Sequence, residues 1–202
     1  MEQYSDEWWQ ARLGKATASK ISDIMTKTKS GYGAGRKNYE AQLIAERLTG
    51  ISPPSFTNAA MQWGTDTEPK ARAAYEFETD NEVTEVGFMG HPTIAMSGAS
   101  PDGLIDGGIL EIKCPNTATH LDTLLNKKIP KKYQTQMFWQ MACCDAKYGD
   151  FVSYDPRLPE NMSMVIIRLE WDAEIVANME SEVETFLTEL SDKVAKLKEI
   201  YE

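Results

Sequence analysis

Cysteine is scarce in this chain, and long apolar runs are absent. The three cysteines (Cys114, Cys143 and Cys144) are odd in number and lack the CxxC spacing of zinc and iron–sulfur sites. They argue against both metal centres and for a reducing, cytoplasmic setting. No segment approaches the roughly 18–20 consecutive apolar residues of a membrane span, and the polar, acidic first residues are unlike a signal peptide. We therefore expect a cytoplasmic protein that does not contact a membrane.

Basic residues are outnumbered, but they are not spread evenly. The 21 Lys and Arg residues face 31 Asp and Glu residues, so the formal net charge is −10. Residues 12–37 nevertheless contain seven basic residues against a single acid, and residues 127–132 contain four lysines and no acid, whereas acids dominate from residue 170 onward. This distribution allows a polyanion to bind at one place and be repelled elsewhere, although a solvated face would explain each basic segment equally well.

The order of the expected elements predicts the fold class. With 202 residues, 42% of them apolar, and with no repeat or linker, the chain is expected to form a single domain over residues 1–202. Helices are expected near residues 5–14, 17–25, 41–50, 58–78, 119–125 and 131–146 and from 172 onward, and strands near 82–89, 93–98, 102–105, 109–114, 151–154 and 164–171. The loosest segment is expected at 30–35. This pattern predicts an α+β fold with a central, mostly antiparallel mixed sheet flanked by helices.

A β-hairpin over residues 100–113 is the most informative feature. Alternating apolar residues flank Asp106-Gly107, a strong hairpin signal. A two-residue turn there places Asp102 directly across from Glu111, with Lys113 on the same face. A turn at Gly107-Gly108 pairs Asp102 with Lys113 and keeps all three on one face, whereas a three-residue loop would separate them.

Two facing carboxylates predict a cation between them. Like charges opposite each other destabilise a sheet, and oxygen ligands favour Mg²⁺ or Mn²⁺. Lys113 is then placed to orient or help deprotonate the attacking water. The alternative is a surface hairpin with solvated ion pairs, which the apolar residues around the three charges make less attractive.

One face of the helix near 131–146 is polar where a buried helix would be apolar. Tyr133, Gln136 and Gln140 follow a helical spacing on this face. If it looks at the sheet, Gln136 could touch Lys113 or a water on the metal. A solvent-exposed face explains the same periodicity.

Taken together, these features resemble the bacteriophage lambda exonuclease family of viral recombinases, a branch of the PD-(D/E)XK nucleases. The resemblance spans about residues 4–200 and follows the family's motif order. Its segments are W-x-Q-x-R-x-G-x-x-T-A-S from Trp8 to Ser19, W-G-x-x-x-E from Trp63 to Glu68, S-P-D-G from Ser100, E-I-K-C-P from Glu111, Tyr133 with Gln136, and Y-D-P-R from Tyr154.

The resemblance implies a restriction-endonuclease-like PD-(D/E)XK core and a Mg²⁺-dependent 5′-to-3′ exonuclease on linear duplex DNA. Two Mg²⁺ ions per active site, replaceable by Mn²⁺, would be held by the side chains of Asp102, Glu111 and Glu68 and by the Ile112 carbonyl. Lys113 would position the attacking water, with support from Gln136 and Tyr133.

Further positions match the family's DNA contacts. Arg12, Ser19 and Ser100 match a pocket for the 5′-terminal phosphate, although Ser19 alone suggests a helix terminus and Ser100 a turn. Met61 matches an apolar wedge that splits the duplex, but a methionine in such a position is more often a core residue. His120 could touch backbone phosphate, although a lone histidine is more often a satisfied surface residue.

The resemblance also implies partners. Family members form ring-shaped homotrimers, in which the basic segments of this chain would line the DNA channel and the acidic C-terminal helix would face away. A single-strand annealing protein would use the resulting 3′ overhang for phage-type recombination in the bacterial cytoplasm. Two alternatives remain: a PD-(D/E)XK endonuclease of restriction or repair type, and a non-catalytic DNA-end-binding protein.

Overall fold

A mixed four-stranded sheet forms the centre of the protein. The computed structural model describes residues 1–29, 31–52 and 58–201. Neighbouring strands follow the order β6-β7-β8-β9; the outer pairs β6/β7 and β8/β9 are antiparallel, and the central pair β7/β8 is parallel. The strands are β6 (Gly103–Ile105), β7 (Gly108–Lys113), β8 (Tyr148–Tyr154) and β9 (Met164–Glu170). This agrees with the predicted mostly antiparallel mixed sheet.

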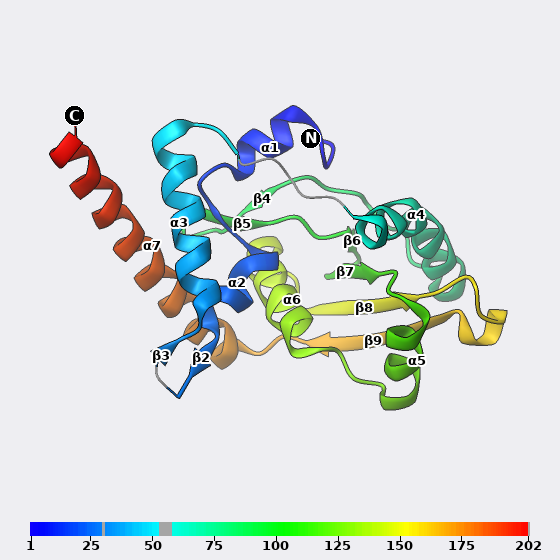
Figure 1. Ribbon diagram of the computed structural model, residues 1–202. Coiled ribbons are helices and arrows are strands. Elements are labelled where there is room, and N and C mark those ends of the chain that lie inside the picture. The colour runs from blue at the N-terminus through cyan, green and yellow to red at the C-terminus, as the bar shows by residue number, and fades with distance from the viewer. Residues whose placement is uncertain (30, 53–57, 202) are drawn as a thin grey trace.

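Two helices make the crossover between the parallel strands. They are α5 (Thr117–Asn126) and α6 (Lys131–Cys144). Parallel neighbouring strands require such a connection, because the chain must return to the starting end of the sheet before the second strand begins, and a tight turn joins only antiparallel strands. Helix α6 packs on β7 and β8 on one side and on α2 on the other, so it lies between the sheet and the N-terminal helices (Figure 1).

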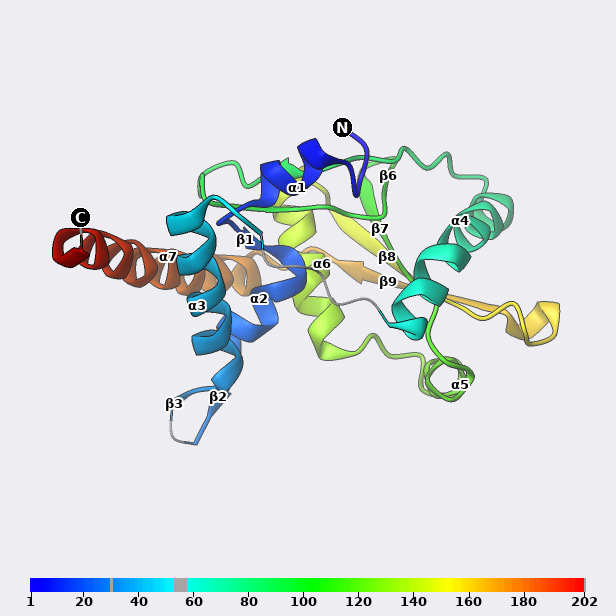
Figure 2. The same ribbon diagram turned by 45° about the horizontal axis from the view of Figure 1, so that its top comes forward.

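The remaining helices lie around this centre. They are α1 (Asp6–Arg12), α2 (Ala18–Met25), α3 (Ala34–Thr49), α4 (Ala59–Thr79) and α7 (Ala173–Tyr201). Predicted caps are confirmed: Ser5 Oγ accepts a hydrogen bond from Trp8 N, and Asn58 Oδ1 accepts one from Met61 N. Helix α4 continues through Pro69 without interruption. Figure 2 shows α4 and α5 at the opposite end of the molecule from α7.

The predicted strands 82–89 and 93–98 are largely wrong. Between residues 82 and 99 the structure has two short strands, β4 (Met89–Gly90) and β5 (Ser97–Ala99), which join β1 (Ala16–Thr17) in a small second sheet. Thr84 makes a single bridge to Leu104. Gly98 allows the close approach of Phe88, since a Cβ there would overlap the Phe88 ring. The apolar pattern of this segment therefore reflects packing against the core and not a continuous strand.

The expected loose segment at 30–35 is also partly wrong. Strands β2 (Lys27–Thr28) and β3 (Gly31–Tyr32) form a short hairpin, and α3 begins at Ala34. Ser30 lies outside the described residues. The hairpin leads into α3, so Lys27 lies in a strand and Arg36 and Lys37 lie in a helix.

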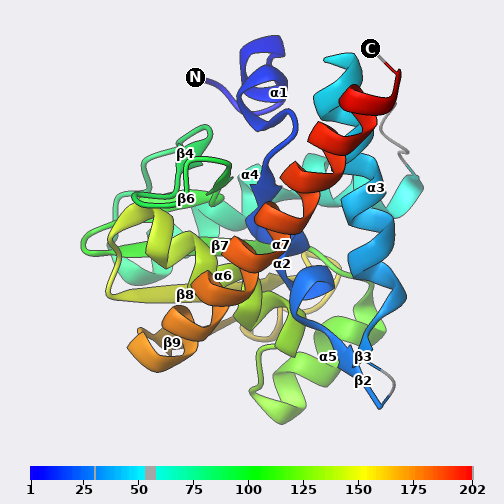
Figure 3. The same cartoon turned by 90° about the vertical axis from the view of Figure 1, so that its left-hand side faces the viewer.

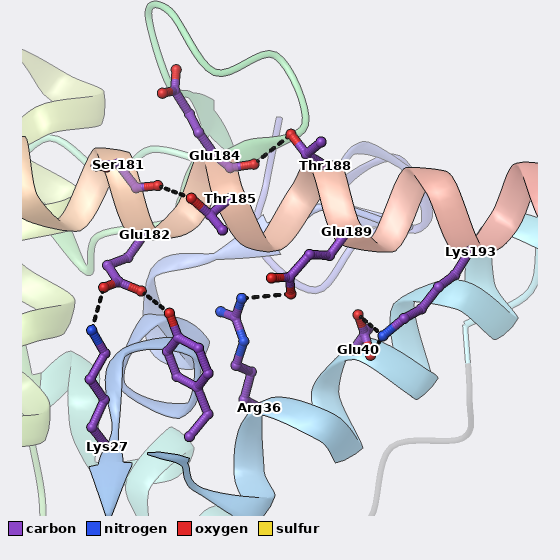
Figure 4. Close-up of polar contacts among 11 residues, drawn as sticks. Lys27, Arg36, Glu40, Ser181, Glu182, Glu184, Thr185, Thr188, Glu189 and Lys193 are labelled. Atoms are coloured by element: carbon purple, nitrogen blue, oxygen red, sulfur yellow. Dashed lines mark hydrogen bonds and ion pairs between the residues drawn. The ribbon is translucent and has the colours of Figure 1, made fainter.

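The acidic helix α7 packs on the N-terminal basic segment instead of facing away from it. Glu182 accepts contacts from Lys27 and the Tyr32 hydroxyl, both at 2.6 Å, and Glu189 pairs with Arg36 at 2.8 Å. Lys193 of α7 forms an ion pair with Glu40 of α3. Figure 3 shows α7 running alongside α3, and Figure 4 shows the side chains of Lys27, Arg36 and Lys193 with their acidic partners. Lys27 and Arg36 are therefore paired with acids of the same chain, and the expectation that α7 faces away from this basic segment is wrong.

Within the described residues, no helix combines the length and the apolar character that crossing a membrane requires. The largest apolar core lies between α6, α2, α3 and α7, with the buried Trp139 and Phe186 among its residues. A second, smaller core joins α4 to the other face of the sheet around Tyr75. The C-terminal half of β7, between these two cores, carries the charged residues Glu111 and Lys113.

Candidate active site

The β6–β7 hairpin has the predicted two-residue turn. Ile105 pairs with Gly108, and Gly107 adopts the left-handed backbone (φ 70°) that the turn requires. Continuing this register places Asp102 opposite Glu111. The Asp102 carboxylate also accepts a 2.6 Å hydrogen bond from the Ile112 amide, which fixes it against β7.

Glu111 is fully buried, and its carboxylate is held by α6. Gln136 donates to Oε1 at 2.7 Å, and Gln140 donates to Oε2 at 2.6 Å. The polar face of the helix therefore looks at the sheet. Gln136 contacts Glu111 and not Lys113, which corrects the expected partner. Gln140, also fully buried, was not among the predicted site residues, although its helical spacing had placed it on this face.

Lys113 supplies positive charge to the pair. Its ammonium contacts the Glu111 carboxylate, lies 2.9 Å from the Ile112 carbonyl oxygen and lies 3.9 Å from Asp102 Oδ2. The same ammonium forms a cation–π contact with Tyr133, at 5.4 Å from the ring centroid. Burial, and then the charge of Glu111, raise the pKa of Asp102 well above its usual range. Burial alone would lower the pKa of Lys113, but the charges of Glu111 and Asp102 raise it.

The predicted third carboxylate does not join this pair. Glu68 on α4 forms an ion pair with Arg72 at 2.9 Å, and Arg72 also contacts Glu85 at 2.7 Å. Burial raises the pKa of Glu68, which also senses the charges of Lys113 and Glu111. Among the described residues, however, no three His, Cys, Asp or Glu side chains gather closely enough to hold a metal ion.

The oxygen atoms beside β7 nevertheless fit a hard divalent cation. Asp102, Glu111 and the Ile112 carbonyl offer only oxygen ligands, which suit Mg²⁺ and Mn²⁺. Within the described part of the chain, Lys113 is the only ion-pair partner of either carboxylate. Two protein carboxylates and a carbonyl leave the remaining positions of such an ion to water or phosphate oxygens, as is usual for Mg²⁺.

A polar cavity of about 190 Å³ adjoins the Asp102 carboxylate. It is lined by Gln3, Tyr4, Trp8, Arg12, Ala18, Ser19, Ser100, Asp102, Lys113 and Gln136. The three residues matched to a phosphate pocket, Arg12, Ser19 and Ser100, therefore line one cavity with three of the predicted catalytic residues, Asp102, Lys113 and Gln136. Sequence reasoning had not selected Gln3, Tyr4 or Trp8.

Arg12 is a cation without an acidic partner. Its guanidinium lies over the Trp8 ring, 4.1 Å from the centroid, and donates to Ser100 Oγ at 3.2 Å; no carboxylate of the described residues pairs with it. Burial lowers the pKa of Arg12. Ser100 Oγ also accepts from Trp8 Nε1 at 2.9 Å, so its own hydrogen is left to donate. A desolvated guanidinium beside a hydroxyl donor suits an anion.

The structure leaves Met61 exposed and buries His120, two residues for which a DNA contact was predicted. Met61 is 51% exposed in the first turn of α4, so it is not a core residue and its side chain is free to contact a ligand. His120 is fully buried, with Nδ1 2.8 Å from Ser153 Oγ and Nε2 2.9 Å from the Met162 carbonyl oxygen. Because both ring nitrogens are engaged inside the protein, the expected phosphate contact of His120 is wrong.

Comparisons with known proteins agree with this geometry. Residues 7–147 match the family model described as "YqaJ-like viral recombinase domain". An alkaline exonuclease from Laribacter hongkongensis is 51% identical, with a TM-score of 0.91, covering 96% of this chain and 97% of that one. The same values hold for that enzyme in complex with dAMP.

A phage-related exonuclease from Haemophilus somnus 129PT shares the fold at 13% identity, with a TM-score of 0.75 and coverage of 91% and 96% of the two chains. No curated protein sequence matches significantly. The likeness to the alkaline exonuclease confirms the predicted PD-(D/E)XK fold.

Proposed function

Because this chain belongs to the YqaJ-like viral recombinase family, the lambda exonuclease-like nucleases, we propose that it is a divalent-metal-dependent 5′-to-3′ exonuclease. It would hydrolyse one strand of linear duplex DNA from a 5′-phosphorylated end and leave a 3′ overhang. A single observation carries this proposal: Arg12, which pairs with no carboxylate of the described residues, shares one cavity with Asp102 and Lys113. An anion site beside a hydrolytic site suits a strand end and not a position within a duplex.

Each residue then has a physical role. Asp102, Glu111 and the Ile112 carbonyl would hold Mg²⁺ or Mn²⁺, and Glu68 would join them on leaving Arg72. Bound divalent ions supply charge stabilisation for in-line displacement at phosphorus. Lys113 would orient the attacking water, and Gln136 and Gln140 keep the Glu111 carboxylate in place. Tyr133 supports Lys113 through its ring.

Arg12, Ser19 and Ser100 would bind the terminal phosphate. After each cut, the newly exposed 5′-phosphate would enter the same pocket and draw the duplex forward by one nucleotide. The exposed Met61 at the start of α4 would act as the wedge that separates the strands. The dAMP bound by the Laribacter enzyme is a nucleoside monophosphate, the size of product that such stepwise cutting would release from this chain.

Arg12→Ala tests the end pocket. Activity on 5′-phosphorylated ends should fall by roughly 10–100-fold, since hydrogen bonds to a charged group contribute about 1.5–3 kcal/mol. Activity on 5′-hydroxyl ends should change little. Initial rates on the two duplexes measure this, with Lys37→Ala, an exposed basic residue of α3, as control. Equal losses on both ends would refute the pocket.

Covalently closed circular DNA and linear duplex together separate the two alternative functions from the proposed one. An internal cutter degrades the circle, whereas an end-dependent exonuclease leaves it intact. A non-catalytic end-binding protein would leave linear duplex intact with Mg²⁺ as well as with EDTA. The carboxylate pair with its lysine favours catalysis over end binding alone.

A ring-shaped homotrimer and a single-strand annealing protein complete the proposal. A closed ring would keep an acidic chain on its polyanionic substrate, and the lysines at 127–132 remain available to line it. Lys27 and Arg36 are not, because α7 neutralises them. Light scattering on the purified protein measures the trimer directly. The annealing protein would bind the 3′ overhang and link the nuclease to phage-type recombination.

A further inference from the structure

Tyr4 occupies an unusual place in this molecule. Its backbone is left-handed (φ 68°), which is costly for a residue with a large side chain. The conformation is held by its neighbours: Gln3 donates to the Val86 and Pro101 carbonyl oxygens at 2.9 and 2.8 Å. Strained conformations of this kind concentrate at functional sites. Because Gln3 is tied to the turn before the hairpin, Tyr4 is fixed relative to Asp102.

The Tyr4 side chain enters the active-site cavity. Its ring packs on Trp8 at 5.2 Å between centroids, while 60% of the residue remains exposed. Tyr4 and Arg12 line the same cavity as Asp102 and Lys113. The phenol senses the negative charges of Glu68 and Asp102 and the positive charges of Lys113 and Arg12. It therefore shares one cavity with the Arg12 guanidinium and the Asp102 carboxylate.

The phenol can act there as a neutral donor. Burial, and then the charges of Glu68 and Asp102, raise its pKa, so the hydroxyl keeps its proton at neutral pH. No hydrogen bond within the described residues engages the Tyr4 hydroxyl. A protonated hydroxyl on a residue that lines a cavity together with an arginine suits a phosphate oxygen.

We propose that Tyr4 is a substrate-binding residue whose hydroxyl donates a hydrogen bond to a phosphate oxygen of the 5′-terminal nucleotide. This inference rests on the proposed function, because it gives the terminal phosphate a donor besides Arg12, Ser19 and Ser100. Tyr4 lines the same cavity as Asp102 and Lys113. It thereby helps to set the spacing between the bound end and the bond that is cut.

Two substitutions separate the hydroxyl from the rest of the side chain. Tyr4→Phe keeps the ring on Trp8 and removes only the donor. It should lower kcat/KM on 5′-phosphorylated duplex about tenfold, mostly through KM, with little change on 5′-hydroxyl duplex. Tyr4→Gly should lose at least as much activity without unfolding at a lower temperature, since glycine accepts the left-handed backbone freely.

Steady-state kinetics on the two duplexes and thermal unfolding measure these effects. Tyr201→Phe, an exposed tyrosine at the end of α7, is the matched control. A Tyr4→Phe enzyme equal to wild type, or equally impaired on both ends, would overturn the role of the hydroxyl while leaving the exonuclease intact. A wild-type protein without end-dependent cleavage would overturn the proposed function and this inference with it.

Discussion

Asp102→Asn should abolish the nuclease, with the rate on linear duplex in Mg²⁺ falling by at least about 10³-fold. The substitution retains an oxygen that can accept the Ile112 amide hydrogen bond but removes the negative charge that a divalent ion needs. Because burial raises the pKa of Asp102, its charged form is costly in the metal-free fold. Removing the charge should therefore leave thermal stability unchanged or higher while activity is lost.

Asp106→Asn provides the matched control for this result. Asp106 is an exposed residue in the turn of the same hairpin, four positions away. Its variant should retain wild-type rates, because it removes a solvated charge on the same scaffold. Cleavage of linear duplex and thermal unfolding in EDTA and in Mg²⁺ measure both variants. An active Asp102→Asn enzyme would remove this carboxylate from the proposed metal site.

Short-range physics explains what could be predicted from the sequence. The Asp106-Gly107 turn fixes the register of the hairpin, and the register then determines which side chains face each other. Side-chain caps at Ser5 and Asn58 likewise depend on residues a few positions away. The helical spacing of Gln136 and Gln140 defined a polar face, although the sequence left open whether it met the sheet or solvent.

Long-range packing explains what could not be predicted. Arg36 meets Glu189 across 153 positions, so a basic segment that looks free in the sequence is neutralised in the fold. Glu68 keeps its motif position, yet Arg72 one turn later holds its carboxylate. His120 contacts Ser153 and the Met162 carbonyl oxygen, which lie 33 and 42 positions later in the chain, so its local sequence does not indicate that it is buried.

Tyr4 illustrates the same limit at the site itself. The W-x-Q-x-R motif begins at Trp8, and Gln3 and Tyr4 precede it and belong to no motif. The structure adds Tyr4 and Gln3 to the cavity because the chain folds back over the turn at Pro101. A left-handed tyrosine is visible only in the backbone angles.

Lys113→Met should separate the catalytic role of the ammonium from its electrostatic role. The three oxygen groups that contact Lys113, in Asp102, Glu111 and Ile112, are the same groups proposed to hold the divalent ion. The lysine and an ion therefore compensate the same buried negative charge. Methionine fills a similar volume without charge, so the carboxylates lose their partner when no metal is present.

The expected result is a divergence between activity and metal binding. In EDTA, the free energy of unfolding of Lys113→Met should fall by about 3 kcal/mol, the effect of breaking a buried ion pair. Mg²⁺ should restore much of this loss and raise the unfolding temperature more than in wild type. Cleavage should nevertheless stay about 10²-fold below wild type, because no group replaces the ammonium beside the attacking water.

Urea unfolding with and without MgCl₂, together with rates on linear duplex, measures both effects. Lys147→Met, whose side chain is 74% exposed, provides the control and should behave as wild type. If Mg²⁺ stabilised Lys113→Met no more than wild type, the ammonium and the ion would not share their oxygen partners. The proposed metal site beside β7 would then have to be placed elsewhere in the cavity.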